Sequence, residues 1–166
     1  MASICYIALG SNLGQRDENL RQALAAIAEL PGTNVELVSH FIITAPVGGP
    51  AGQEDYCNAA ARLATELLPE ELLTALAGVE RKLGRFRSGE MRYGPRLMDL
   101  DILFYNDWVL DKPKLTIPHP RLHERLFVLR PLAEIAPNLI HPLMGKSILA
   151  LLRSCPMGSC HTVNTV

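Results

Sequence analysis

The sequence of 166 residues has few of the features that mark a membrane or secreted protein. No window approaches the roughly 18 uninterrupted apolar residues that a membrane-spanning helix needs. The start, MASICYIALG, lacks a basic region and runs directly into a strand-like pattern, which is not typical of a signal peptide. The four cysteines show no framework spacing, and this favours reduced thiols and a cytoplasmic protein.

Several motifs of nucleotide and metal chemistry are missing as well. There is no G-x-x-x-x-G-K-[ST] sequence to hold a triphosphate, and no G-x-G-x-x-G opens a helix for a dinucleotide. Cys155, Cys160 and His161 lie together near the C-terminus, where their spacing gives poor zinc geometry. No nucleophile elbow indicates Ser-His-Asp hydrolysis. If phosphates bind, metal ions and arginines must therefore hold them.

Charge is distributed unevenly, although the net charge is only −1. Residues 1–80 carry 3 basic and 10 acidic side chains, whereas residues 81–166 carry 13 and 7. Six basic residues fall within residues 81–96, namely Arg81, Lys82, Arg85, Arg87, Arg92 and Arg96. Such a cluster is typical either of a solvated loop or of a site for a polyanion.

Two carboxylates follow this basic segment within an apolar run. Asp99 and Asp101 stand two residues apart in a predicted strand over 99–105. Alternation along a strand points both to one side, with their Cα atoms about 6.5–7 Å apart. Two such charges repel, and a pair of Mg²⁺ ions would remove the conflict. The alternative is a solvent-facing strand that happens to carry two acids, and it is the commoner case for so short a pattern.

Hydrophobic periodicity predicts strand, helix, strand, strand, helix, strand and then further helices. This order predicts an α+β, ferredoxin-like βαββαβ fold, with a mostly antiparallel sheet, helices on one face and extra C-terminal helices. We expect one domain over 1–154 and a loosely ordered tail over 155–166. The predicted elements are strands 3–9, 35–44, 56–64 and 99–105, and helices 16–30, 69–84, 121–135 and 148–152.

Four segments in order carry a resemblance to a known family: ALGSNLG, DYCNAA, GPRLMDLDILFY and TIPHPRLHERLFVLRPLAEIAP. From Ile4 to about Leu152 the chain resembles the 6-hydroxymethyl-7,8-dihydropterin pyrophosphokinases of folate biosynthesis. The resemblance implies a monomeric, cytoplasmic enzyme that transfers pyrophosphate from ATP, with two Mg²⁺ ions, to the pterin hydroxymethyl group and releases AMP. No nucleic-acid or membrane partner is expected, because the calculated pI is only about 6.5, no aromatic-rich RNP-like strand appears and no apolar run is long enough to span a membrane. That the β-phosphorus is attacked follows from the resemblance alone.

The resemblance also implies roles for individual residues. The implied catalytic residues are Arg85, Arg87, Arg96, Asp99 and Asp101, of which the two aspartates bind the metal. Those implied to bind ATP are Glu80, Arg87, Arg96, Ile102, Lys114, Thr116, His119 and Arg125. Those implied to bind the pterin are Thr44, Pro46, Val47, Tyr56, Asn58 and Phe127.

Alternatives stay open for several of these residues and for the function. Tyr56 and Phe127 suit the faces of a flat pterin, but they are also typical of core packing. His119 between two prolines is otherwise a common surface histidine. Tyr93 stands where the family often has tryptophan, and Leu97-Met98 replaces the more usual Thr-Leu. The segments 84–95 and 45–53 are predicted lids. A generic metal-dependent phosphoryl or nucleotidyl transferase and an RNA-binding module are the competing functions.

Overall fold

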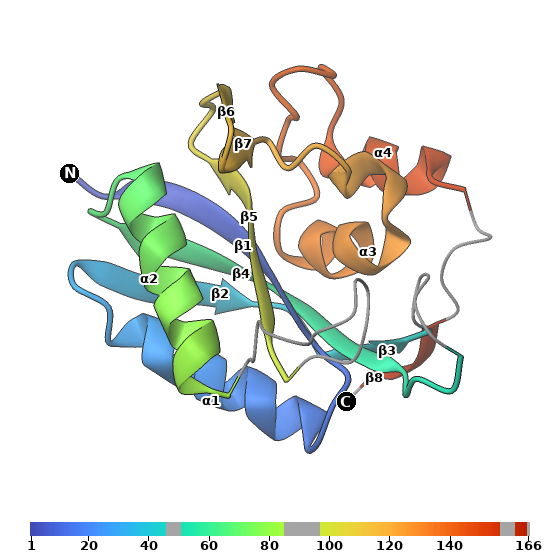
Figure 1. The fold of residues 1–166 in the computed structure, drawn as a ribbon. Coiled ribbons are helices and arrows are strands. Elements are labelled where there is room, and N and C mark those ends of the chain that lie inside the picture. The colour runs from blue at the N-terminus through green and yellow to red at the C-terminus, as the bar shows by residue number, and fades with distance from the viewer. Residues whose placement is uncertain (46–50, 85–96, 157–161, 166) are drawn as a thin grey trace.

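A six-stranded antiparallel sheet lies at the centre of the computed structural model, which describes residues 1–45, 51–84, 97–156 and 162–165. The strands run in the order β5-β1-β4-β3-β8, and β2 also pairs with β4 (Figure 1). This is the arrangement expected for the ferredoxin-like fold, which is thereby confirmed. Its strands are β1 (Ser3–Ser11), β2 (Thr33–Val38), β3 (Ile42–Thr44), β4 (Tyr56–Thr65), β5 (Asp99–Tyr105) and β8 (Thr162–Thr165).

One face of the sheet is covered by α1 (Arg16–Ala28) and α2 (Pro69–Lys82). Pro69 occupies the first turn of α2, where its missing N–H costs nothing. The Glu71 carboxylate accepts a hydrogen bond of 2.8 Å from the Leu68 backbone N–H and so caps the helix start. Gly84, at φ +94°, ends the helical segment in a conformation that favours glycine. The start of α2 agrees with the prediction, whereas the helix ends at Lys82, two residues before the predicted end.

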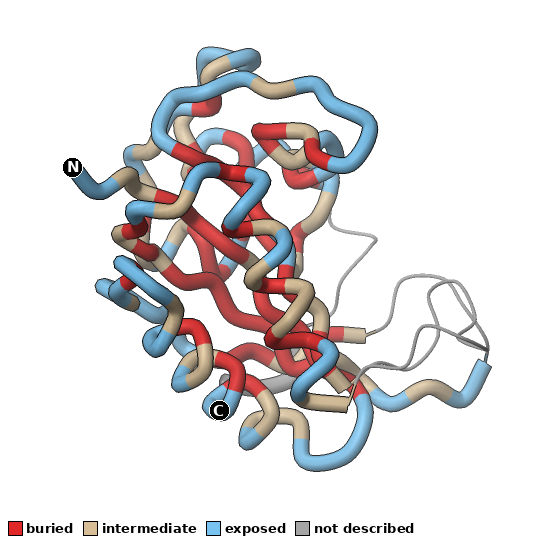
Figure 2. The backbone as a smooth tube through the Cα atoms, turned by 60° about the vertical axis from the view of Figure 1, so that its left-hand side comes forward, coloured by how far each residue is buried: buried red, intermediate tan, exposed pale blue. Residues whose placement is uncertain are grey.

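The opposite face is covered in part by α3 (Leu126–Ile135) and α4 (Ile148–Ser154). Their apolar residues pack with Tyr6, Leu103 and Phe104 in a second core. Figure 2 shows the buried strands running between these two layers. The C-terminal helices thus give the sheet a second covered face.

Two predicted elements differ in detail, and a hairpin is added after β5. The strand predicted over 35–44 is two strands. At Ser39, between them, the backbone N–H still donates to the Ala60 carbonyl at 2.9 Å, but the Ala60 N–H donates to the Ser39 side-chain Oγ, also at 2.9 Å. The helix predicted over 121–135 is a 3₁₀ turn, η1 (Leu122–Glu124), followed by α3, with Arg125 extended between them. After β5 comes a hairpin of β6 (Leu110–Lys112) and β7 (Leu115–Ile117).

The C-terminal segment contributes a strand that the sequence does not predict. Within the expected tail, β8 pairs antiparallel with β3, and Thr162 lies opposite Thr44. The domain boundary at residue 154 stays a prediction. Within the described ranges, no helix is long and apolar enough to cross a membrane.

Candidate active site

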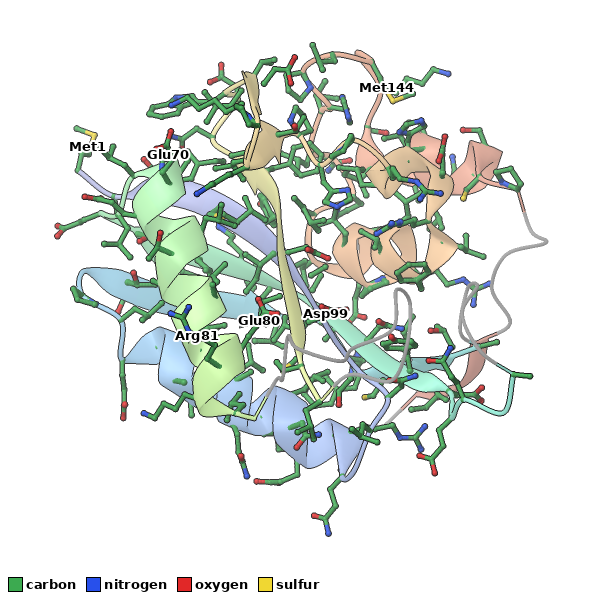
Figure 3. All side chains as sticks on the ribbon, viewed as in Figure 1. Met1, Glu70, Glu80, Arg81, Asp99 and Met144 are labelled. Atoms are coloured by element: carbon green, nitrogen blue, oxygen red, sulfur yellow. The ribbon has the colours of Figure 1, made fainter. Side chains whose placement is uncertain are left out.

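The two aspartates lie on one face of β5, as predicted. Asp99 is half-buried and Asp101 is exposed, whereas the intervening Leu100 is 5% exposed in the core below α2. Because Leu100 packs toward α1 and α2, the two carboxylates point to the opposite face of the sheet, which α3 and α4 cover only in part (Figures 1 and 3). Both carboxylates are hard oxygen donors, and Mg²⁺ accepts few such ligands besides water and phosphate. The donor set therefore fits Mg²⁺.

Three residues of the candidate site form a row across neighbouring strands: Asp99, Gly10 and Asn58. Gly10 on β1 lies opposite Asp99 on β5 and opposite Asn58 on β4, so all three share one face. A Cβ at position 10 would lie 3.0 Å from Asn58 Oδ1 and 3.6 Å from Tyr56 Cδ1. A Cβ here would crowd the Asn58 amide oxygen, whereas its distance to Tyr56 is an ordinary van der Waals contact, so glycine lets the Asn58 side chain lie over β1.

The amide of Asn58 is held in one orientation. Its Nδ2 donates to Thr44 Oγ1, and both residues are buried, at 6% and 1% exposed. The Oδ1 atom then points over Gly10, on the side of the carboxylates. Asn58 therefore offers an acceptor to the site, while its donor is engaged with Thr44.

Two aromatic side chains come from β4 and from the helix that packs on it. Tyr56 opens β4 and shares a face with Asn58, and it is half-buried. Phe127 lies in the first turn of α3, which packs on β4, and it too is half-buried. The Arg125 guanidinium carbon lies 5.8 Å from the centroid of the Phe127 ring. Both rings are partly exposed, and Phe127 also packs against the second core.

His119 lies between Pro118 and Pro120 on the connector from β7 to η1. Its backbone N–H donates to Leu103 O at 3.0 Å, and its Nδ1 accepts from the Arg121 N–H at 3.2 Å. Burial, followed by the charges of Arg125 and Arg121, lowers the pKa of His119 to about 4. The ring is therefore neutral at pH 7, and with Nδ1 accepting, Nε2 carries the proton. His119 can donate a hydrogen bond without adding charge.

The other predicted nucleotide residues occupy different environments. Glu80 on α2 is 6% exposed, and Figure 3 shows its side chain directed toward β5. Ile102 is 4% exposed in the core, which leaves only its backbone for a nucleotide contact. Lys114 is exposed and Thr116 half-buried on the hairpin of β6 and β7. The predicted residues outside the described ranges are Pro46, Val47, Arg85, Arg87 and Arg96.

The sequence analysis missed two kinds of residue here. Gly10 lies in the ALGSNLG segment but was not predicted as a site residue, although a Cβ there would lie 3.0 Å from Asn58 Oδ1. The sequence analysis also passed over Asn12 and Arg16, which contact the segment that precedes Tyr56. An asparagine directly after a strand and an arginine at a helix start are the features that could have drawn attention to them.

Comparisons with known proteins identify the family of the chain. The model of a family described as 7,8-dihydro-6-hydroxymethylpterin-pyrophosphokinase (HPPK) matches residues 6–137. A 2-amino-4-hydroxy-6-hydroxymethyldihydropteridine pyrophosphokinase of Pseudomonas aeruginosa is 44% identical over 151 residues, which cover 91% of this chain and 91% of the relative. The protein of the same name from Bacillus subtilis is 47% identical over 135 residues, covering 81% and 79%.

A solved structure of wild-type HPPK-DHPS from Plasmodium falciparum aligns with a TM-score of 0.70 at 16% identity. The alignment covers 92% of this chain and 41% of that longer one, so the chain spans about two fifths of its length. At this identity the likeness shows the fold alone. The two sequence relatives, in contrast, are matched over most of their own length, and both they and the family model match most of this chain. The chain belongs to the 7,8-dihydro-6-hydroxymethylpterin-pyrophosphokinase family.

Proposed function

We propose that the chain transfers the terminal pyrophosphoryl group of MgATP to the hydroxymethyl group of 6-hydroxymethyl-7,8-dihydropterin and releases AMP. The observation that carries the proposal is the row formed by Asp99, Gly10 and Asn58 across three strands. It brings a carboxylate pair suited to metal and phosphate to the same face as a fixed amide suited to a heterocycle. Transfer between the two substrates requires this proximity.

Asp99 and Asp101 are the residues that would hold two Mg²⁺ ions. The exposed side of Asp101 leaves room for water and phosphate oxygens to complete the coordination. Bound there, the metal would neutralise phosphate charge and align the attacked phosphorus with the pterin hydroxyl. Asp99, anchored by its strand pairing with Gly10, would set the position of the phosphates relative to the pterin.

The pterin subsite is formed by Asn58, Thr44 and the two rings. Asn58 Oδ1 would accept a hydrogen bond from an N–H of the pterin rim, because its Nδ2 is already engaged with Thr44. Tyr56 and Phe127 would lie against the faces of the pterin ring, which is flat and π-rich. Pro46 and Val47 stay predicted members of this subsite.

The phosphates of ATP would be bound by a neutral hydrogen-bond donor, His119, and by positively charged arginines. His119 would donate from Nε2 to a phosphate or sugar oxygen, and the Arg125 guanidinium would offset negative charge. Glu80, Ile102, Lys114 and Thr116 are the further predicted contacts of ATP. Arg85, Arg87 and Arg96 stay the arginines predicted to stabilise charge on the transferring oxygens.

Product analysis tests the proposal. Purified protein is incubated with MgATP and the pterin, and nucleotides and pterins are separated chromatographically. We expect AMP and the pterin diphosphate in equal amounts, and Asp101→Asn should abolish both. Asp107→Asn, a change at an exposed aspartate in the turn after β5, is the matched control. ADP as the nucleotide product would indicate γ-phosphoryl transfer, and release of inorganic pyrophosphate would indicate nucleotidyl transfer; either result contradicts the proposal.

We further propose a cytoplasmic monomer that has no nucleic-acid partner. Three cysteines within the described residues (Cys5, Cys57 and Cys155) are unbridged and buried, which suits a reducing compartment. Light scattering after gel filtration should give a mass near 18.2 kDa. Retention of RNA that is lost at high salt would contradict the absence of a nucleic-acid partner.

A further inference from the structure

The end of β1 places a buried amide against the segment that leads into β4. Asn12 is 2% exposed. Its Nδ2 donates to Gln53 Oε1 at 3.1 Å and to the Glu54 carbonyl at 3.3 Å. A buried amide is costly unless it is hydrogen-bonded, so these bonds favour one arrangement of the 53–54 backbone.

A second side chain from the same turn holds the next residue. Arg16 is the first residue of α1, and its Nη1 donates to the Asp55 carbonyl. A cation at this end of a helix opposes the helix dipole, and the preceding Gln15 makes no side-chain cap. Local helix stability therefore does not explain the arginine, whereas its bond to Asp55 does.

The turn that carries both side chains is itself fixed. Asn19 on α1 donates from Nδ2 to Ser11 Oγ at 3.1 Å and to the Leu13 carbonyl at 2.9 Å. The turn between β1 and α1, which carries Asn12 and leads to Arg16, is thus held to both elements. Residues 53–55 are hydrogen-bonded to this turn and to the start of α1, directly before Tyr56 begins β4.

We infer that Asn12 and Arg16 are positioning residues for the pterin subsite. They fix the backbone of residues 53–55 and, through it, the place of Tyr56 over Gly10. Asn12 acts through its neighbours, because its side chain is covered. The inference rests on the proposed function, since it assigns these residues to one of the two substrates.

The effect should be confined to the pterin. Residues 53–55 lead into Tyr56 and Asn58, whereas the carboxylates lie on β5 and His119 and Arg125 lie beyond β7. If the 53–55 backbone were loosened, it would have to become ordered when the pterin binds, and this would lower pterin affinity. The contacts to the phosphates of ATP would stay in place. A role in general stability would instead lower the melting temperature without separating the substrates.

The test compares Michaelis constants for the two substrates in Asn12→Ala and Arg16→Ala. Each change should raise the KM for the pterin by about 5- to 30-fold, the size expected for one lost hydrogen bond. The KM for ATP should change by less than about twofold. Arg16→Lys should recover part of the loss, because an ammonium can also donate to a carbonyl. Arg62→Ala, which removes an ion pair with Glu36 far along β4, should leave both constants unchanged.

A double-mutant cycle tests the route through Gln53. If Asn12 acts by holding that side chain, Asn12→Ala and Gln53→Ala combined should raise the pterin KM by less than the product of the single effects. Unchanged KM values for the pterin, or equal rises in the KM values for pterin and ATP, would overturn the inference. If the wild type still turned over the pterin, the proposed function would stand in that case. Absence of pterin turnover in the wild type would instead refute the proposed function itself.

Discussion

Asp101 is the exposed carboxylate of the pair, and Asp99 is half-buried beside it. We expect Asp99→Ala and Asp101→Ala each to lower kcat by several orders of magnitude, because the transition-state charge loses its bridging metal. The fold should persist, since removing one of two like charges relieves repulsion. Single-turnover rates at saturating Mg²⁺, with circular dichroism as the folding control, measure both effects. A near-normal kcat in either variant would contradict the metal assignment.

Phe127 is predicted to contact the pterin and not ATP, so its substitution should affect the binding of one substrate only. Phe127→Ala should weaken pterin binding by roughly 1–3 kcal/mol, the scale of one aromatic stacking contact. ATP affinity should change little, although the variant also removes the ring beneath the Arg125 guanidinium. Calorimetric titration with each ligand measures the difference. Equal losses for both ligands would show that Phe127 is a packing residue.

His119 links stability to pH. Its pKa is lowered to about 4 by burial and by neighbouring arginines, whereas in the unfolded chain it lies near 6.5. Between these values the unfolded chain binds more protons, so the free energy of unfolding falls as the pH drops from 6.5 toward 4. His119→Asn should remove about 1–2 kcal/mol of this loss at pH 5. Urea unfolding at pH 7 and pH 5 measures it, and an identical pH dependence in wild type and variant would refute the assignment.

At the scale of elements, β8 covers the edge of the short strand β3. β3 carries Thr44, whose Oγ1 holds the Asn58 amide. Without β8 this edge would be open to water and less ordered. Removal of residues 157–166 should therefore raise the pterin KM by about two- to fivefold, with little change for ATP. The same kinetic assay applies, and an unchanged pterin KM would show that β8 does not support the subsite.

The elements themselves were largely predictable. Asp99–Tyr105 and the start of α2 at Pro69 agree with the prediction because hydrophobic pattern and capping residues are local features. The break at Ser39 was not predictable, since its cause is a hydrogen bond to Ala60, which lies 21 residues away. β8 was missed for the same reason: a four-residue strand depends on the partner edge that it meets.

At the scale of the whole molecule, two cores share one sheet. Leu76 on α2 belongs to the core under one face and Leu129 on α3 to the core under the other, and both are at most 1% exposed. Leu76→Ala and Leu129→Ala should each cost about 2–5 kcal/mol. Each variant should still unfold in one transition, because both cores depend on the same strands. Separate calorimetric transitions for the two sides would contradict this coupling.

The sequence by itself determined the βαββαβ order of the central elements, the shared face of Asp99 and Asp101, and the family resemblance from which the reaction is inferred. Each of these depends on residues close together in the chain or on ordered motifs. Only the tertiary structure decided that Gly10 lies between Asp99 and Asn58 and that Asn12 and Arg16 hold the 53–55 backbone. These relations join residues some 40 to 90 positions apart, and strand register and side-chain hydrogen bonds, which form only in the folded chain, create them.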